Sequence, residues 1–191
     1  VSVMPIRAAA FAAVFYSMLS GIVSVAADAN FDPDTGLRIH HYTDPVPATV
    51  PGAQTLDTQA ASELWQSGDA LFVDVLSISG VRYDELDGSW SDYPERRNIE
   101  GSVWLPNVGY GRPAPDMLGY FLKAVAEATE GNQSHPIVIY CIRDCWMGWN
   151  AVQHLADAGY DRLYWYPEGT DGWVSAGHSL ALSEPVPVNL D

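Results

Sequence analysis

The sequence predicts one α/β domain with a mostly parallel sheet and helices on both of its faces. Two observations predict this fold: short apolar runs alternate with amphipathic helical segments, and 191 residues is the usual length of one domain. Hydrophobic residues make up 48% of the chain, enough for a sizeable core. We expect residues 1–27 to be a signal peptide, 28–54 an extended arm and 55–191 the domain itself.

The first segment has the features of an export signal. Arg7 carries its one positive charge, an uncharged stretch follows, and Val25-Ala26-Ala27 offers small residues at a cleavage site. An uncleaved membrane anchor is the alternative, since about 20 uncharged residues could just span a bilayer. Small and polar interruptions favour cleavage, so we expect a periplasmic protein with no membrane segment once the signal is removed. The arm that follows is polar and rich in proline.

The first half of the domain contains one helix and two strands. Asp57 or Thr58 can cap a helix that runs through Trp65 and ends at Gly68. The apolar run 71–75 predicts a buried strand, and 103–105 predicts a weaker one. The connection from Ser77 to Gly101 is long, acidic and aromatic, which indicates short elements of its own, a lid over the site or a solvated insertion.

The second half repeats the alternation more clearly. Residues 116–129 carry apolar side chains on one helical face, and Gly131 ends that helix. Residues 137–140 form the clearest strand, a helix is expected over 147–158, and 163–165 predicts another strand. Three tryptophans are expected in the core: Trp104, Trp165 and Trp173.

The charge of the chain limits its partners. Nine basic residues against 24 acidic ones give a formal charge of −15. Such a surface repels phosphate backbones and anionic membranes, so nucleic acid is excluded as a partner. Small molecules and basic proteins remain.

Cys141 is the candidate reactive residue. It directly follows the strand 137–140 and precedes a helix, at the carboxyl edge of the sheet where ligands of such folds bind. Unpaired amides and the helix dipole would stabilise its thiolate there, and the amides of Ile142 to Trp146 could hold a sulfur-bound anion. We expect Met147 to belong to the same anion-binding loop. The site is expected to be exposed, with Trp146 shielding one side of it from water.

Three roles for Cys141 and Cys145 remain open. They could form an inert structural bridge, a redox pair in which Cys141 attacks and Cys145 resolves, or a persulfide carrier in which Cys145 is incidental. Arg143 would add positive charge that Asp144 largely cancels. Asp74 could anchor the Cys141 loop through its amides, bind Arg143 or simply cap its own strand.

Four segments, in order, resemble the rhodanese family. The run 71–75 resembles its first core strand, and 99–106 is similar to its I-P-G-A-x-x-I-P segment. The run 137–141 resembles the strand that carries the family's catalytic cysteine, and 168–177 resembles its G-G-x-x-x-W…A-G signature. The resemblance implies sulfur transfer at Cys141, with a small sulfur compound or a thiol protein as the partner. It implies no cofactor beyond a persulfide or disulfide on that cysteine.

The loop departs from the pattern C-x-x-G-x-R of active rhodaneses. Asp144 stands at the glycine and Trp146 at the arginine, which argues against routine thiosulfate:cyanide transfer. The pattern C-x-x-x-C-W instead resembles rhodanese-like proteins associated with PQQ-dependent alcohol catabolism. That resemblance implies a periplasmic location and, as a partner, a PQQ-dependent dehydrogenase or a cytochrome c. A non-catalytic accessory protein of such a system is the alternative function.

Other chemistries fit the residues less well. A cysteine phosphatase would need an arginine where Met147 stands. Zinc bound by the two cysteines and His154 would need a helix residue to turn back to the loop, so no metal is expected. The pair His40-His41 is expected to be solvated.

Overall fold

The computed structural model describes residues 28–189, and the expected signal peptide lies outside the described residues. The elements, in order, are β1 (Gln54–Thr55), α1 (Thr58–Ser67), β2 (Leu71–Asp74), β3 (Arg96–Asn98), β4 (Val103–Trp104), α2 (Pro115–Ala128), β5 (Ile137–Tyr140), α3 (Trp146–Asp157), β6 (Leu163–Tyr166), α4 (Gly169–Ser175) and β7 (Ala181–Ser183).

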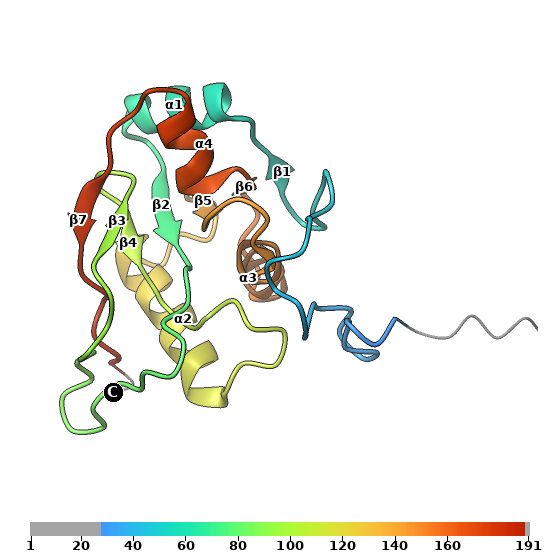
Figure 1. The fold of residues 1–191 in the computed structure, drawn as a ribbon, viewed down its shortest axis with the longest axis vertical. Helices are drawn as coiled ribbons and strands as arrows, with labels where there is room; N and C mark the ends of the chain where they lie inside the picture. The colour runs from blue at the N-terminus through green and yellow to red at the C-terminus, as the bar shows by residue number, and fades with distance from the viewer. Residues whose placement is uncertain (1–27, 190–191) are drawn as a thin grey trace, which may run out of the picture.

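The main sheet has five parallel strands in the order β1-β6-β5-β2-β4 (Figure 1). β5 lies at its centre, and all four residues of that strand are buried. β3 and β7 form a separate antiparallel pair. The α/β class with a mostly parallel sheet is therefore confirmed.

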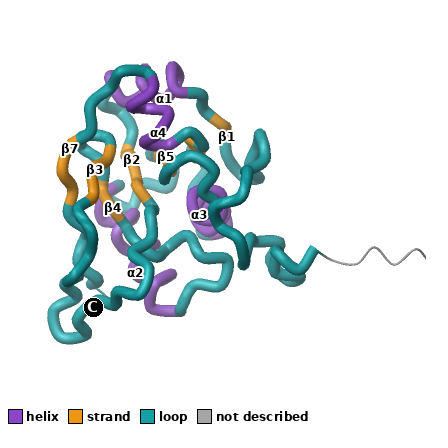
Figure 2. The backbone as a smooth tube through the Cα atoms, in the orientation of Figure 1, coloured by secondary structure: helices purple, strands orange, loops and turns teal. Residues whose placement is uncertain are grey.

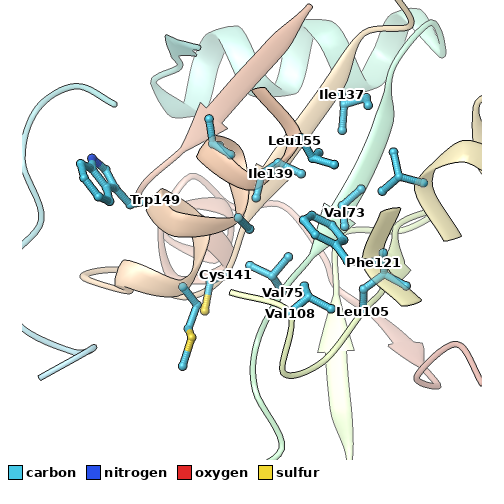
Figure 3. Close-up of a cluster of buried hydrophobic side chains, with 14 of the residues drawn as sticks. Val73, Val75, Leu105, Val108, Phe121, Ile137, Ile139, Cys141, Trp149 and Leu155 are labelled. Carbon is cyan, nitrogen blue, oxygen red and sulfur yellow. The ribbon is translucent and has the colours of Figure 1, made fainter. Parts of the chain in front are cut away.

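Alternating side chains of the strands build a core on each face of the sheet. Ile137 and Ile139 point to the face covered by α2 and α3, whereas Val138 and Tyr140 point to the face covered by α1 and α4 (Figure 1). Figure 3 shows the larger of these two cores. Trp104, Trp165 and Trp173 are each 1% exposed, as expected for core residues.

The N-terminal capping residue and the terminating glycine predicted for α1 are both observed. The Asp57 carboxylate accepts the Ala60 N–H at 2.8 Å, and Gly68 ends the helix in the left-handed conformation, at φ 71°. The predicted boundaries of the other regular elements differ from the observed ones by one residue at most. The short strands β1, β3 and β7 and the helix α4 were not predicted.

Residues 28–53 lie along α3, and the irregular segment 77–101 lies beside α2 (Figure 2). The second segment contains β3 and an antiparallel bridge between Tyr83 and Trp90, so it does carry short elements of its own. None of the helices between residues 28 and 189 combines the length and the apolar character needed to cross a bilayer.

Candidate active site

Cys141 stands at the carboxyl edge of the sheet, where its sequence position predicted it. The β-branched run of β5 ends at Tyr140, residues 141–145 turn, and α3 begins at Trp146. Cys145 is the residue that caps this helix, in an extended conformation. The loop therefore connects the most deeply buried strand to the first turn of a helix.

Cys141 and Cys145 form a disulfide, with their Cα atoms 6.1 Å apart. The residues are only 2% and 6% exposed, so the expectation of an exposed thiol is wrong for this oxidised state. Both belong to the hydrophobic cluster that contains Val75 and Val108, the labelled neighbours of Cys141 in Figure 3. A reaction at the bridge therefore requires the loop to give access.

The loop amides are only partly available to an anion. The Arg143 N–H donates to the Asp171 carboxylate at 2.8 Å, and the Trp146 N–H donates to the Tyr42 carbonyl at 2.8 Å. The expected cradle made of all amides from Ile142 to Trp146 is thus wrong, because the protein supplies its own acceptors for two of them. Residues 142–145 form a turn, and the hydrogen bonds found within residues 28–189 include none from the N–H of Ile142 or Asp144.

The start of α4 packs tightly against the loop. The Thr170 N–H donates to the Cys141 carbonyl at 3.0 Å. Gly169 makes this approach possible, because it has φ of 51° and a Cβ atom there would collide with the Cys141 carbonyl. The family-like segment around Gly169 therefore positions the loop, and it also brings Asp171 and Glu168 next to it.

The positive charge of the loop, on Arg143, is paired with a carboxylate at the start of α4. The Arg143 guanidinium lies 3.4 Å from the Glu168 carboxylate, and both side chains are about half exposed. Asp144 has φ of 55°, the left-handed conformation in which glycine would be favoured and which aspartate tolerates better than most residues. Asp144 thus adopts a backbone conformation that suits glycine, and it places a carboxyl group in the loop.

Comparison with known proteins shows the family. The model of the rhodanese-like domain matches residues 56–176, which is more than half of the chain. The chain belongs to the rhodanese-like family. No curated protein matches the chain.

Several solved structures, two of them of sulfur transferases, are similar to this chain at a distance. A thiosulfate sulfurtransferase from Pseudomonas aeruginosa is 19% identical, with a TM-score of 0.48 over 70% of this chain and 21% of that one. A protein of uncharacterised function from Saccharomyces cerevisiae is 17% identical, with a TM-score of 0.40 over 65% of this chain and 93% of that one. The polysulfide-sulfur transferase of Wolinella succinogenes is 14% identical, with a TM-score of 0.38 over 68% and 79% of the two chains. The rhodanese-like chain spans about a fifth of the Pseudomonas protein, and likeness this distant transfers no activity.

Trp146 lies in the same hydrophobic cluster as the two cysteines of the rhodanese-like loop. It is 6% exposed and packs edge-on against Phe31 and Trp149, with ring centroids 5.4 and 5.2 Å away. The arm supplies the apolar partner Phe31, so the side chain at this loop position enters a core. The indole Nε1 is buried and has no hydrogen-bond partner among the described residues.

Arg38 of the arm completes this cluster. Its guanidinium lies 4.7 Å from the Trp146 ring centroid and forms an ion pair with Asp44 at 2.7 Å. Asn150, fully buried on α3, accepts the Arg38 N–H and donates to the Arg38 carbonyl, each at 2.9 Å. Residues 28–53 are therefore fastened to the helix that begins at the cysteine loop.

Met147, predicted to lie in the anion-binding loop, lies in the first turn of α3 and is 4% exposed. It packs close to Gly109, where any Cβ atom would collide with the Met147 backbone. Met147 therefore faces the core in this structure, and the loop proper ends at Cys145.

Asp74 contacts neither the cysteine loop amides nor Arg143. Its carboxylate forms an ion pair with Arg96 at 2.7 Å and accepts the Leu76 N–H at 3.0 Å, which is the strand-end cap. Burial raises the pKa of Asp74, and the Arg96 guanidinium opposes that shift. Asp74 thus holds the end of β2 and the start of β3, and its link to the site is indirect.

The segment 77–101 packs away from the cysteine loop. The Tyr83 hydroxyl donates to Asp116 at 2.8 Å, and Trp90 donates to the Val186 carbonyl at 3.0 Å. With α2 it encloses a pocket of about 440 Å³ whose walls include Tyr83, Trp90, Tyr110 and Asn107. None of the hydrogen bonds found for this segment within residues 28–189 reaches residues 141–145, so we find no support there for a lid over the disulfide.

The histidines lie apart from the disulfide. His40 and His41 are exposed on the arm, and His154 is buried with its Nε2 3.0 Å from the Tyr110 carbonyl. Among the described residues, no group of three or more histidine, cysteine, aspartate and glutamate side chains could hold a metal ion.

Proposed function

We propose that Cys141 and Cys145 form a reversible thiol–disulfide couple, with Cys141 as the nucleophile and Cys145 as the resolving residue. The observation that carries this proposal is the disulfide between the end of β5 and the first turn of α3. In that position the helix dipole lowers the free energy of a thiolate, which is the reacting form of cysteine.

The exchange moves two electrons in two steps. The Cys141 thiolate attacks one sulfur of a partner disulfide, so that a bond to Cys141 Sγ forms, the partner S–S bond breaks and the leaving thiolate takes a proton. The Cys145 thiolate then attacks Cys141 Sγ, closes the internal bridge and releases the second partner thiol. The pair is oxidised and the partner reduced, and the reverse sequence reduces the pair.

Sulfur transfer at Cys141 is the second candidate function. The amides of Ile142 and Asp144 have no hydrogen-bond acceptor found among the described residues, and they are suited to hold the outer sulfur of a persulfide. Membership of the rhodanese-like family favours the same chemistry. The partner would be a small sulfur compound or a thiol protein.

Intact mass under non-reducing conditions separates the two functions when it is taken on the protein as isolated, and on the reduced and desalted protein before and after thiosulfate. Only a free Cys141 thiolate can take the outer sulfur of thiosulfate and release sulfite. A mass two hydrogens below that of the dithiol, unchanged by thiosulfate, supports the couple. A gain of one sulfur mapped to Cys141 supports the carrier. Cys145→Ser should then trap a mixed disulfide on Cys141 in the first case, and Cys141→Ser should abolish both reactions.

We further propose that the protein is exported and works in the periplasm, in a system for PQQ-dependent alcohol oxidation. The signal-like segment 1–27 and the C-x-x-x-C-W pattern support this, and an oxidising compartment is where disulfides persist. A mature chain starting at Asp28 in the periplasmic fraction, together with a growth defect on alcohols in a deletion strain, is the expected result. A cytoplasmic chain with an intact N-terminus would contradict it.

A non-catalytic accessory role is favoured by one observation, the burial of both cysteines. The partner would then be a PQQ-dependent dehydrogenase or a basic cytochrome c that binds the acidic surface. In that case the double substitution Cys141→Ser and Cys145→Ser would leave partner affinity unchanged, whereas the thiol proposals require loss of turnover.

A further inference from the structure

The solvent-facing side of the disulfide loop is dominated by negative charge. We call Asp144, Glu168 and Asp171 the acidic rim. Asp144 belongs to the loop itself, Asp171 accepts the Arg143 N–H at 2.8 Å, and Glu168 lies 3.4 Å from the Arg143 guanidinium. One guanidinium against three carboxylates leaves a net negative charge around the bridge.

We infer that this rim makes the site select cationic thiols, and thiols on basic protein surfaces, over anionic sulfur compounds. The inference rests on the proposed thiol–disulfide function and names its substrate class. The sulfur oxyanions that rhodanese-like loops could hold are disfavoured here for two separate reasons.

The first reason is that acceptors of the protein itself already occupy part of the anion-binding loop. The Asp171 carboxylate already accepts the loop amide of Arg143, so a carboxylate of the protein stands where an anion would bind. The Trp146 amide, nearest the helix dipole, is likewise taken by the Tyr42 carbonyl. An arriving anion could use the two remaining amides, of Ile142 and Asp144, only beside a fixed negative charge.

The second reason is the field outside the loop. Arg143 is held by Glu168, so its charge is compensated locally instead of being available to an incoming anion. The Asp144 side chain is partly exposed and that of Asp171 is exposed, so both carboxylates face solvent beside the loop. Within a Debye length of about 10 Å at 0.1 M salt, such charges attract cations and repel anions.

Three small thiols of similar size test the inference: cysteamine, which is cationic, 2-mercaptoethanol, which is neutral, and 2-mercaptoethanesulfonate, which is anionic. The first thiolate attacks Cys141 Sγ and releases the Cys145 thiolate, and a second thiolate then takes the bound group and leaves Cys141 reduced. Two thiols become one small disulfide for each bridge reduced, and their protons pass to solvent or to the cysteines. The readout is the rate at which the disulfide of the folded protein is reduced, divided by the concentration of the thiolate form of each reagent. Free cysteines are trapped by alkylation at timed intervals and counted by intact mass.

The rim variant is Asp144→Asn, Glu168→Gln and Asp171→Asn together. The amide oxygen introduced at position 171 can still accept the Arg143 N–H, and asparagine tolerates the positive φ of position 144. The matched control is Asp69→Asn, Glu130→Gln and Asp161→Asn. These three exposed acids precede β2, β5 and β6, so they lie toward the opposite edge of the sheet, and the control changes net charge equally.

We compare the rate of reduction by cysteamine with the rate by 2-mercaptoethanesulfonate. At low salt this rate ratio should be about ten-fold larger in the native protein than in the rim variant. The difference between the two proteins should shrink at about 1 M salt. The control should keep the native ratio. The inference would be overturned if the control variant lost as much of the rate ratio as the rim variant does. It would also be overturned if the ratio in the native protein were no larger than in the rim variant. Either result would leave the thiol–disulfide couple intact. Failure of every thiol to reduce the folded protein would overturn the couple as well.

Discussion

Two long irregular segments of this rhodanese-like protein differ in what they hold. Residues 28–53 bind α3, and the Tyr42 carbonyl accepts the Trp146 N–H beside Cys145. Residues 77–101 bind α2 and the C-terminal segment through Tyr83 and Trp90. Both are loop over most of their length (Figure 2), yet only the first is fastened to the element that begins at the disulfide. From this comparison we expect the arm, and not the insertion, to control access of thiols to the cysteines.

The largest effect is expected from Trp146→Ala. The substitution removes a buried indole between the arm and α3, and should lower the free energy of unfolding by about 3–5 kcal/mol. It should also speed reduction of the disulfide in the folded protein, because the arm loosens. Urea unfolding and timed thiol trapping measure the two effects.

Trp90→Ala is the matched control for that experiment. Trp90 is 7% exposed in the insertion, so its loss should destabilise the fold by a similar amount without altering the reduction rate of the folded state. Equal acceleration in both variants would mean that reduction follows global unfolding, and the distinction between the segments would fail.

Asn150→Ala should have the next largest effect. The Asn150 amide accepts the Arg38 N–H and donates to the carbonyls of Arg38 and Gly109, so its removal leaves buried backbone groups unpaired. We expect a loss of about 3 kcal/mol in unfolding free energy. Hydrogen exchange should show the arm losing protection while residues 77–101 keep theirs. Equal loss of hydrogen-exchange protection in the arm and in residues 77–101 would contradict the account.

Tyr83→Phe should have a smaller effect, confined to the insertion. It removes the hydroxyl that donates to Asp116, a contact worth about 1 kcal/mol. The disulfide should be reduced at the native rate in this variant. A faster rate would show that the insertion does influence the cysteine loop.

Acid should loosen the arm through Asp32. The hydrogen bond from Arg112, helped by the amides of Thr35 and Asp34, lowers the pKa of Asp32 from 3.8 to about 2. A lowered pKa means that the ionised carboxylate stabilises the folded state, so this contribution is complete above about pH 4 and is lost as the pH falls toward 2. An NMR titration of the Asp32 carboxyl should show the low midpoint, and Arg112→Met should move it upward.

The regular elements could be predicted because their own residues encode them. β5 is a continuous apolar run, and α1 has a capping aspartate and a terminal glycine. β3 is Arg96-Arg97-Asn98, which has no apolar pattern, and it becomes a strand only because β7 pairs with it. Elements defined by a distant partner leave no local signal in the sequence.

The site shows the same limit. The position of Cys141 followed from the strand before it, whereas the acceptors of its loop come from elsewhere: Asp171 lies 28 residues after Arg143, and Tyr42 lies in the arm. The pairing of Asp74 with Arg96 spans 22 residues of an irregular connection. The resemblance of segment 168–177 to the rhodanese signature was the one available signal. It marked the family and did not predict that Gly169 and its acidic neighbours lie at the site.

A redox titration of the folded protein tests the central claim most directly. The protein is equilibrated with dithiothreitol buffers of graded potential, the Cys141–Cys145 bridge is followed by intact mass, and near-ultraviolet circular dichroism reports the tertiary structure. We predict complete and reversible reduction while the native spectrum is retained. Reduction that occurs only together with loss of that spectrum would show an inert structural bridge and contradict the account.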